Sequence, residues 1–136
     1  MNKEEIYAYL NNKKIWYEAV EHIAVYNMND LSKVEMPYKD SDAKNLFIRD
    51  DKKNHYYLIT VKGNKRVDLK QFRNQMNTRP LSFASEDDLM DILKLLPGSV
   101  TPLGILNDND IKVEVFIDID FIKDPGIIGV HPCDNT

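Results

Sequence analysis

The first residues of the chain have the pattern of a capped helix. Asn2 is followed three positions later by Glu5, and side chains of these two kinds at this spacing form a capping box. Ile6, Tyr9 and Leu10 then recur at the spacing of one helix face. The sequence therefore predicts a first helix close to the N-terminus.

Beyond this helix, runs typical of strands and helices alternate and are separated by polar turns. Strands are predicted over residues 15–20, 44–49, 55–61, 81–84, 103–106, 112–118 and 126–130, and helices over 29–34, 68–72 and 85–96. Turns are predicted at 50–54, 62–65 and 107–110, the second with Gly63 available for a positive φ. The helix that Ser85 caps is expected to end at Pro97-Gly98. The pattern is that of a mixed α/β (α+β) fold.

Length and composition limit the chain to a single domain over residues 1–136, since 136 residues with 43% hydrophobic content allow one core. There is no apolar signal region and no run of about eighteen apolar residues, so a cytoplasmic protein is expected. One cysteine, Cys133, cannot form an internal disulfide. Because the three histidines lack the spacing of a zinc site, no structural metal is expected.

Charge is distributed unevenly along the chain, although the net charge is only -4. Residues 1–43 carry five basic and eight acidic side chains, residues 44–80 carry ten and three, and residues 81–136 carry three and eleven. The basic segment also contains Phe47, His55, Tyr56, Tyr57 and Phe72. Such a mixture suits phosphates and unstacked bases, but a solvated hairpin with no ligand would have the same composition.

Two turns combine glycine or proline with polar side chains. Gly98 and Pro102 restrict the ends of a loop, Gly-Ser-Val-Thr-Pro, that can point backbone N–H groups inward at an anion or a carbonyl. A glycine after a helix is, however, also the usual stop signal. In the second turn, residues 129–135, His131 and Cys133 are candidates for catalysis, although each is also typical of a structural position.

Three motifs in order carry a resemblance to a known family. They are AKNLFIRD at 43–50, LSFASEDDLMDILKLLPGSVTPLGILND at 81–108 and GVHPCDN at 129–135. They resemble the lysine strand, the helix with its GxxxP loop, and the GxHP turn of the YbaK-like superfamily of aminoacyl-tRNA deacylases. Within it, the chain is most similar to the ProXp-ala branch, also called the prolyl-tRNA synthetase-associated domain, PrdX or ProX. The resemblance implies a mixed, barrel-like β-sheet flanked by helices.

Enzymes of that branch hydrolyse alanine wrongly attached to proline tRNA, so the resemblance implies a trans-editing hydrolase that needs no cofactor. The positions that match its functional residues are Lys44, Asn45, Gly98, Ser99, Val100, Thr101, Pro102 and His131. Lys44 begins an apolar strand, where a charge needs a partner such as a phosphate or carbonyl oxygen of the tRNA 3′ end. The loop backbone would place a water and stabilise the oxyanion. His131 would orient the water, contact the amino group or shape the pocket.

Selectivity is expected to depend on the size of the pocket. A synthetase site built for proline cannot strongly reject alanine, because each missing methylene is worth only about 1–3 kcal/mol. We expect Met28, Val100 and Leu103 to line a pocket that admits alanine and excludes the proline ring. The branch often has phenylalanine and alanine where this chain has Leu103 and Gly104. Cysteine or another small residue on proline tRNA therefore remains an alternative substrate.

A non-catalytic module that binds tRNA or prolyl-tRNA synthetase is a second alternative, because the basic segment would serve it equally well. Lys65 and Arg66 of this segment are expected to contact the tRNA, and neither a membrane nor DNA is an expected partner. The family continues past the position of Thr136 with a further strand and a closing helix. The chain is therefore expected to be a shortened form of the domain.

Overall fold

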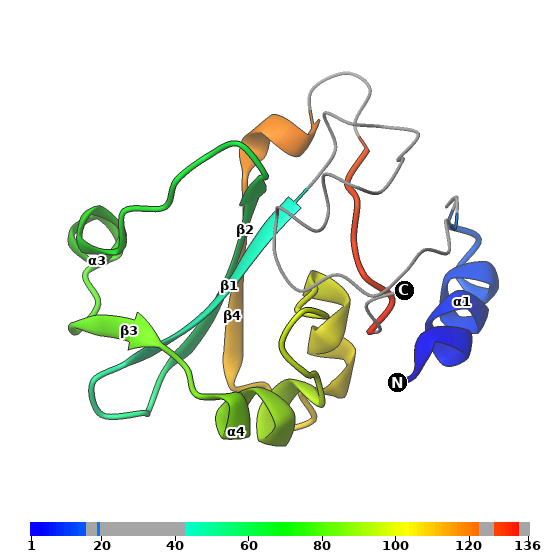
Figure 1. Cartoon of the computed structure of the whole chain (residues 1–136), viewed down its shortest axis with the longest axis horizontal. Helices are drawn as coiled ribbons and strands as arrows, with labels where there is room; N and C mark the ends of the chain where they lie inside the picture. Colours follow the sequence, from blue (N-terminus) through cyan, green and yellow to red (C-terminus); the bar gives the residue numbers. More distant parts are fainter. Residues whose placement is uncertain (16–18, 20–42, 123–126, 134–136) are drawn as a thin grey trace.

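The computed structural model describes residues 1–15, 19, 43–122 and 127–133 (Figure 1). Its helices are α1 (Lys3–Asn12), α3 (Leu69–Met76), α4 (Glu86–Asp88), the π-helix η2 (Leu89–Leu93) and the 3₁₀-helices η3 (Pro102–Asn107) and η4 (Ile119–Ile122). Its strands are β1 (Ala43–Asp50), β2 (Tyr56–Lys62), β3 (Leu81–Phe83) and β4 (Val113–Ile117). The strand expected at 15–20 lies almost wholly, and the helix expected at 29–34 wholly, outside the described residues.

The four strands form one open, mixed sheet in the order β3-β1-β2-β4. β1 and β2 are an antiparallel hairpin in which Asn45 faces Thr60 and Lys44 faces Val61. β3 pairs antiparallel with β1, whereas β4 pairs parallel with β2. The predicted α+β class is confirmed, and β3 and β4 are the two edges of the sheet in the described part of the chain.

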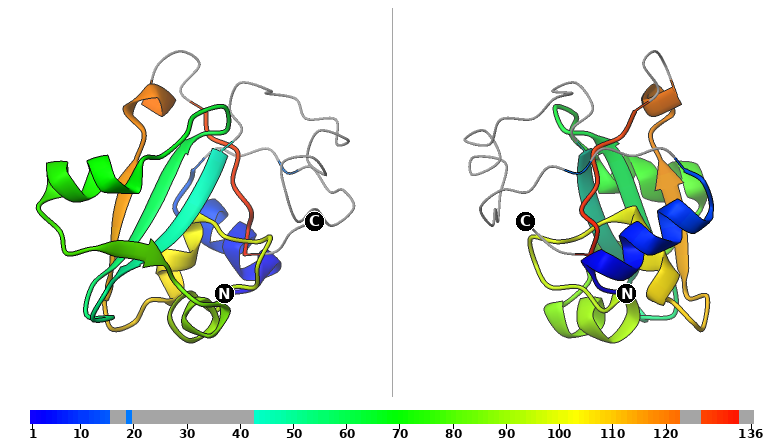
Figure 2. Two further views of the ribbon diagram at one scale, coloured as in Figure 1. Left: turned by 60° about the vertical axis from the view of Figure 1, so that its left-hand side comes forward. Right: turned by 90° about the vertical axis from the view of Figure 1, so that its right-hand side faces the viewer.

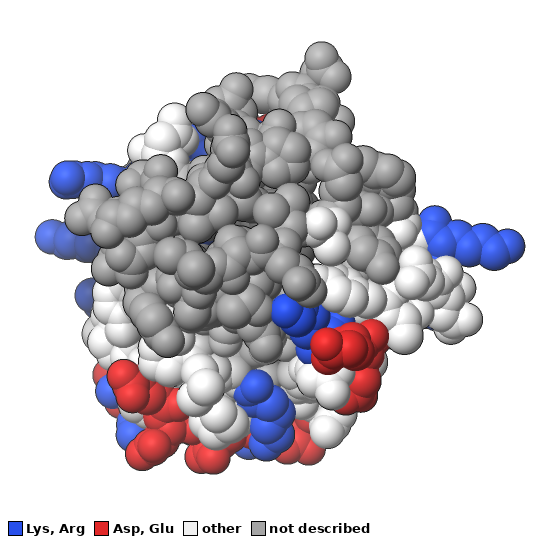
Figure 3. All heavy atoms as spheres, turned by 45° about the vertical axis from the view of Figure 1, so that its right-hand side comes forward, with Lys and Arg blue, Asp and Glu red and all other residues white. Residues whose placement is uncertain are grey.

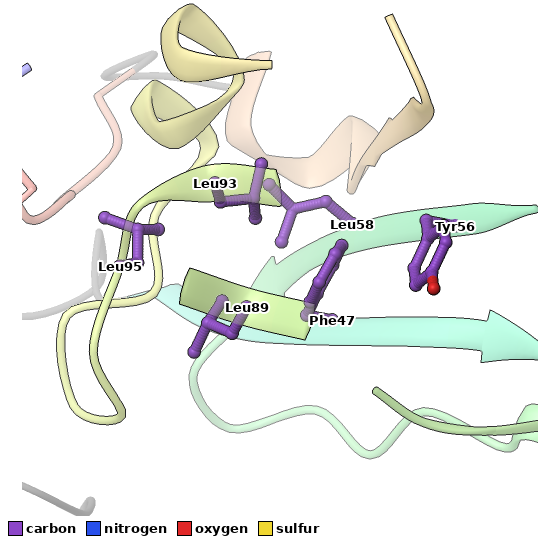
Figure 4. Packing of buried hydrophobic residues seen from close by; sticks show 6 residues of the cluster. All are labelled: Phe47, Tyr56, Leu58, Leu89, Leu93 and Leu95. Carbon is purple, nitrogen blue, oxygen red and sulfur yellow. The ribbon is translucent and has the colours of Figure 1, made fainter. Parts of the chain in front are cut away.

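Helices cover both faces of this sheet, with α3 on one side and α4, η2 and η3 on the other (Figures 1 and 2). Successive strand residues point to opposite faces, so Phe47 and Leu58 pack on the η2 side and Ile48 and Tyr57 on the α3 side. Figure 4 shows Phe47, Tyr56 and Leu58 of the sheet facing Leu89, Leu93 and Leu95. Each buried side chain of this size contributes about 1.5–3 kcal/mol, so the sheet is held from both sides.

The predicted N-terminal helix is confirmed in detail. The Asn2 side chain accepts a hydrogen bond from the Glu5 N–H at 2.8 Å, and the Glu5 carboxylate accepts one from the Asn2 N–H at 3.4 Å. Ile6 is the buried residue of α1, and the Met1 ammonium donates to the side chain of Asn107 in η3. This helix therefore lies on the η3 side of the sheet. No helix in the described ranges is long and apolar enough to cross a membrane.

The helix expected over 85–96 is shorter than predicted. Ser85 caps it as expected, but the helix widens into η2 and ends at Lys94, which is in the left-handed region at φ 58°. This reversal directs Leu95 into the core, where it is 1% exposed. Burial of one leucine thus ends the helix three residues before Pro97.

The strand expected at 103–106 is wrong, because these residues belong to the 3₁₀-helix η3. Thr101 caps this helix through a hydrogen bond from the Leu103 N–H to its hydroxyl, and Pro102 occupies the first helical position. Residues 127–130, part of another expected strand, have no regular secondary structure. The turn at 62–65 is present, with the Lys65 N–H bonded to the Lys62 carbonyl, but Gly63 does not have a positive φ.

Candidate active site

The GxxxP loop begins with a tight turn over residues 96–99. The Ser99 N–H donates to the Leu96 carbonyl at 3.1 Å, and Gly98 has a φ of 89°. Proline at the second position and a glycine with positive φ at the third are the features of a type II turn. Gly98 is therefore needed for this turn and does not cap the preceding helix. Ser99, which is 5% exposed, adds a second bond from its hydroxyl to the same Leu96 carbonyl at 2.9 Å.

Asn45 ties this loop to the centre of the sheet. Its amide nitrogen Nδ2 donates to the Val100 carbonyl at 3.1 Å, and its oxygen Oδ1 accepts from the Thr60 hydroxyl at 2.7 Å. Thr60 is fully buried, and cross-strand pairing with Asn45 places both side chains on one face. The Asn45 side chain is thus used to hold the loop.

The loop presents backbone N–H groups that have no acceptor in the described part of the chain. The Val100 carbonyl points at Asn45, so the N–H of the same planar peptide, which belongs to Thr101, points the opposite way. Thr101 is fully buried, yet neither its N–H nor that of Val100 bonds to a described residue. Backbone N–H groups held in place by a loop are what an oxyanion site requires.

Lys44 lies on the opposite face of β1 from Asn45, because neighbouring strand residues alternate. Its ammonium Nζ donates to the carbonyl oxygen of Lys65 at 3.3 Å, just beyond the end of β2. The side chain is half-buried, and its described hydrogen-bond partner is a neutral group. Lys44 and the GxxxP loop therefore approach the same end of the sheet from different faces.

Lys65 is engaged within the protein. Its Nζ lies 2.7 Å from a carboxylate oxygen of Asp118 and 2.5 Å from one of Asp120. Burial alone would raise the pKa of Asp118, but hydrogen bonds from Lys65 and from the Asp120 and Lys62 N–H groups outweigh it and lower that pKa below its ordinary value. The ion pairs fix the loop whose carbonyl faces Lys44. Arg66, the neighbouring candidate for tRNA contact, is exposed.

The lowered pKa of Asp118 predicts a specific pH dependence of stability. A carboxylate with a depressed folded-state pKa stabilises the fold above its unfolded value of 3.8, and this contribution is lost as the pH falls through the folded value. We expect Asp118→Asn to lower the free energy of unfolding at pH 7, and the difference from wild type to shrink below pH 3.8. Urea unfolding across this range measures it. Asp110→Asn is the matched control, because the Asp110 side chain is 79% exposed; a pH-independent Asp118→Asn difference would contradict the assignment.

The segment that contains His131 shares the face of the loop. Cys133 packs against the same cluster as Val100, and the Asn107 amide lies 4.0 Å from its sulfur. Burial raises the pKa of the Cys133 thiol above its ordinary value. A protonated thiol is a weak nucleophile, so Cys133 is unsuited to covalent catalysis. His131 is half-buried and two residues away.

The structure brings together most, but not all, of the predicted residues. Asn45 is bonded to the GxxxP loop on one face of the sheet, and Cys133 packs against the same core cluster as Val100. Lys44 bonds to the Lys65 carbonyl at the end of the sheet. Leu103 is half-buried beside the loop, whereas Met28 lies outside the described residues. The described ranges contain no group of three or more His, Cys, Asp or Glu that could hold a metal. Sequence reasoning missed Thr60, although a polar residue in an apolar strand opposite Asn45 could have indicated it.

Residues 22–136 match the family of aminoacyl-tRNA editing domains. The prolyl-tRNA editing protein ProX of Acetoanaerobium sticklandii is 38% identical over 134 residues, which span 98% of this chain and 81% of that protein. Prolyl-tRNA synthetase associated domain-containing protein 1 of Mus musculus is 33% identical over 98 residues, or 70% of this chain. The match covers 58% of the mouse protein, so it leaves much of that relative unmatched.

Solved structures share the fold at low sequence identity. The hypothetical protein APE2540 superposes with a TM-score of 0.65 at 14% identity, over 89% of this chain and 76% of that one. A candidate trans-editing enzyme for prolyl tRNA synthetase superposes with a TM-score of 0.59 at 20% identity, over 79% and 65% of the two chains. Because the family match extends over most of the sequence, the resemblance of the three motifs is confirmed, and the chain belongs to the aminoacyl-tRNA editing domain family.

Proposed function

We propose that the protein is a trans-editing deacylase that hydrolyses the ester of mischarged tRNA(Pro), with Ala-tRNA(Pro) as its main substrate. The observation that supports this most is the buried GxxxP loop, whose Val100 and Thr101 N–H groups have no acceptor among the described residues. Membership of the editing family and the likeness to a prolyl-tRNA editing protein support the same substrate class.

The proposed chemistry needs little more than positioned water and donors. The ester carbonyl enters the loop with its oxygen toward the two N–H groups, and a water attacks the carbonyl carbon. The bond from this carbon to the terminal ribose oxygen then breaks, and the proton lost by the water passes to that oxygen. The neighbouring ribose hydroxyl of the substrate can relay this proton. The products are the free amino acid and uncharged tRNA.

Lys44 is proposed to bind a phosphate of the tRNA 3′ end as that end crosses the edge of the hairpin toward the loop. Among the described residues, its ammonium donates to a neutral carbonyl, so a phosphate would be a stronger partner. Exposed Arg66 lies directly beyond Lys65 and would extend the contact. Lys65 itself is proposed to act through the loop it fixes, because Asp118 and Asp120 already neutralise its charge.

Amino-acid selectivity is proposed to depend on the residues that border the loop. Val100 and Leu103 are half-buried, and Met28 completes the set proposed from the sequence. Gly104 adds a constraint, because a Cβ at this position would lie 2.7 Å from Leu95 Cδ1. η3 therefore packs closely on the core. Leu103, in place of a larger aromatic side chain, is proposed to widen the amino-acid pocket. A wider pocket would accept cysteine as well as alanine.

Single-turnover hydrolysis of separately charged tRNA(Pro) tests the proposal. With excess protein, Ala-tRNA(Pro) is expected to be deacylated much faster than Pro-tRNA(Pro), since the ring of proline overlaps the pocket wall. A faster reaction with Cys-tRNA(Pro) would change the substrate but keep the chemistry. No acceleration over buffer with any of the three, together with tight tRNA binding, would identify a binding module and overturn the proposed enzyme.

Binding of tRNA is expected to depend on salt. The face drawn in Figure 3 carries acidic and basic side chains side by side along its lower rim, and this mixture does not favour a phosphate backbone. The tRNA-binding surface is therefore proposed to follow the basic segment 44–80, including Arg66, Lys70 and Arg73. With about four phosphate contacts, the logarithm of the tRNA association constant should fall against the logarithm of the salt concentration with a slope of about -3. Arg66→Gln should flatten this slope by about 0.7–0.9. Lys112→Gln is the control, because Lys112 lies outside the basic segment. An unchanged slope in Arg66→Gln would mean that the tRNA binds to another surface.

A further inference from the structure

Thr60 is a polar residue in the middle of an otherwise apolar stretch of β2. Its neighbours Leu58 and Ile59 are core residues, and Thr60 is itself fully buried. A hydroxyl at such a position destabilises the fold unless it is hydrogen-bonded, and valine has nearly the same shape without this requirement. The packing of the strand therefore does not explain why threonine is present. Its hydrogen bond to Asn45 does.

The orientation of the Asn45 amide follows from its two partners. The Val100 carbonyl can only accept a hydrogen bond, so the amide nitrogen must face it. The amide oxygen must then face Thr60, whose hydroxyl is a donor at 2.7 Å. Without this donor, the amide oxygen loses its described hydrogen-bond partner, and the amide is anchored only through its nitrogen. The amide can then rotate to find another donor for its oxygen, which weakens its bond to the Val100 carbonyl.

We infer that Thr60 is a positioning residue for the hydrolysis proposed above, on which this inference rests. Its hydroxyl fixes the Asn45 amide, the amide holds the Val100 carbonyl, and the same peptide unit points the Thr101 N–H at the ester. Thr60 is thus inferred to act through Asn45 and not on the substrate directly. These two hydrogen bonds link the sheet to the loop that binds the reacting ester.

Two substitutions separate the hydroxyl from the shape of the side chain. Thr60→Val keeps the shape and removes the donor, whereas Thr60→Ser keeps the donor and removes a methyl group. At saturating tRNA, Thr60→Val is expected to lower kcat about tenfold or more, and Thr60→Ser should remain within about threefold of wild type. KM should change little in either variant, because the tRNA contacts lie elsewhere. Equal loss of kcat in both variants, in step with their melting temperatures, would overturn the inference in favour of a packing role.

A double-mutant cycle tests whether Thr60 acts through Asn45. If it does, Asn45→Ala already releases the loop, and adding Thr60→Val should cost nothing further. Multiplied losses in the double variant would mean that Thr60 acts by another route, and the inference would fail.

The last measurement does not depend on activity. In NMR spectra of the free protein, Thr60→Val should shift the side-chain amide signals of Asn45 and the backbone amide signal of Thr101, and Thr60→Ser should leave them near their wild-type positions. If these signals shift but the protein hydrolyses no charged tRNA, the hydrogen-bond series from Thr60 to Thr101 is supported and the proposed function fails. Unchanged signals in Thr60→Val would overturn this hydrogen-bond series whatever the activity.

Discussion

Lys44→Ala should reduce single-turnover hydrolysis of Ala-tRNA(Pro) below about a tenth of the wild-type rate, a loss of at least about 1.4 kcal/mol in the barrier. The half-buried Lys44 ammonium has one described hydrogen bond, 3.3 Å from a neutral carbonyl. A substrate phosphate would add a charge-assisted bond, and alanine removes it together with the orientation it gives the 3′ end.

The fold of the Lys44 variant should be intact, because in the described part of the chain the substitution deletes one hydrogen bond, to a neutral carbonyl. Melting temperature is therefore expected to stay within a few degrees of wild type. Lys112→Ala removes another lysine side chain, which lies 4.0 Å from a carboxylate oxygen of Asp110. It should react at the wild-type rate. If Lys44→Ala kept more than about a tenth of the wild-type rate, Lys44 would not be the residue that binds the substrate phosphate.

Gly98→Ala should also reduce kcat about tenfold or more while lowering stability much less. An alanine disfavours a φ of 89°, and the turn can relieve the strain by changing the φ of residue 98, which limits the loss of stability. That change would reorient the following residues Ser99 and Val100, so the N–H groups would no longer converge on the ester oxygen. Single-turnover rates and thermal unfolding of the same preparations measure both effects.

Gly63→Ala is the matched control for this substitution. Gly63 also lies in a turn, but it does not have a positive φ, so an alanine is accommodated without strain. It should change neither the rate nor the melting temperature appreciably. Parallel losses of rate and stability in Gly98→Ala would make the loop an ordinary structural turn.

The hairpin and the first helix could be predicted because local and tertiary preferences agree there. Continuous runs of bulky apolar residues define β1 and β2, and Asn2 with Glu5 defines the start of α1. The run at 103–106 was misassigned because four residues with no clear period fit either a strand or a tight helix. Thr101 at the N-cap and Pro102 at the first helical position favour the 3₁₀-helix η3 over a strand. This pair could have been recognised in the sequence as a helix start.

For the candidate site, the sequence identified the loop but not its internal connections. Lys44 and Asn45 are consecutive in the sequence, but strand alternation sends their side chains to opposite faces of the sheet. The charge of Lys65 predicts tRNA contact, but its ion pair with Asp118, 53 positions away in the sequence, lies beyond what local patterns reveal. Register and long-range ion pairs depend on the folded sheet, so these roles could not be predicted from spacing.

The register of the β1–β2 hairpin has a consequence for how such a domain can vary in length. The pairing of Asn45 with Thr60 fixes which of two adjacent side chains reaches the loop. A single-residue insertion in β1 between Asn45 and Phe47 would move every earlier side chain of the strand to the other face of the sheet. Lys44 would then face the GxxxP loop, and Asn45 would be buried among apolar groups. Insertions of two residues, or insertions confined to the polar connection at 51–55, would keep the facing intact. Length changes tolerated by the fold are therefore expected to occur in this connection or in pairs within the strand.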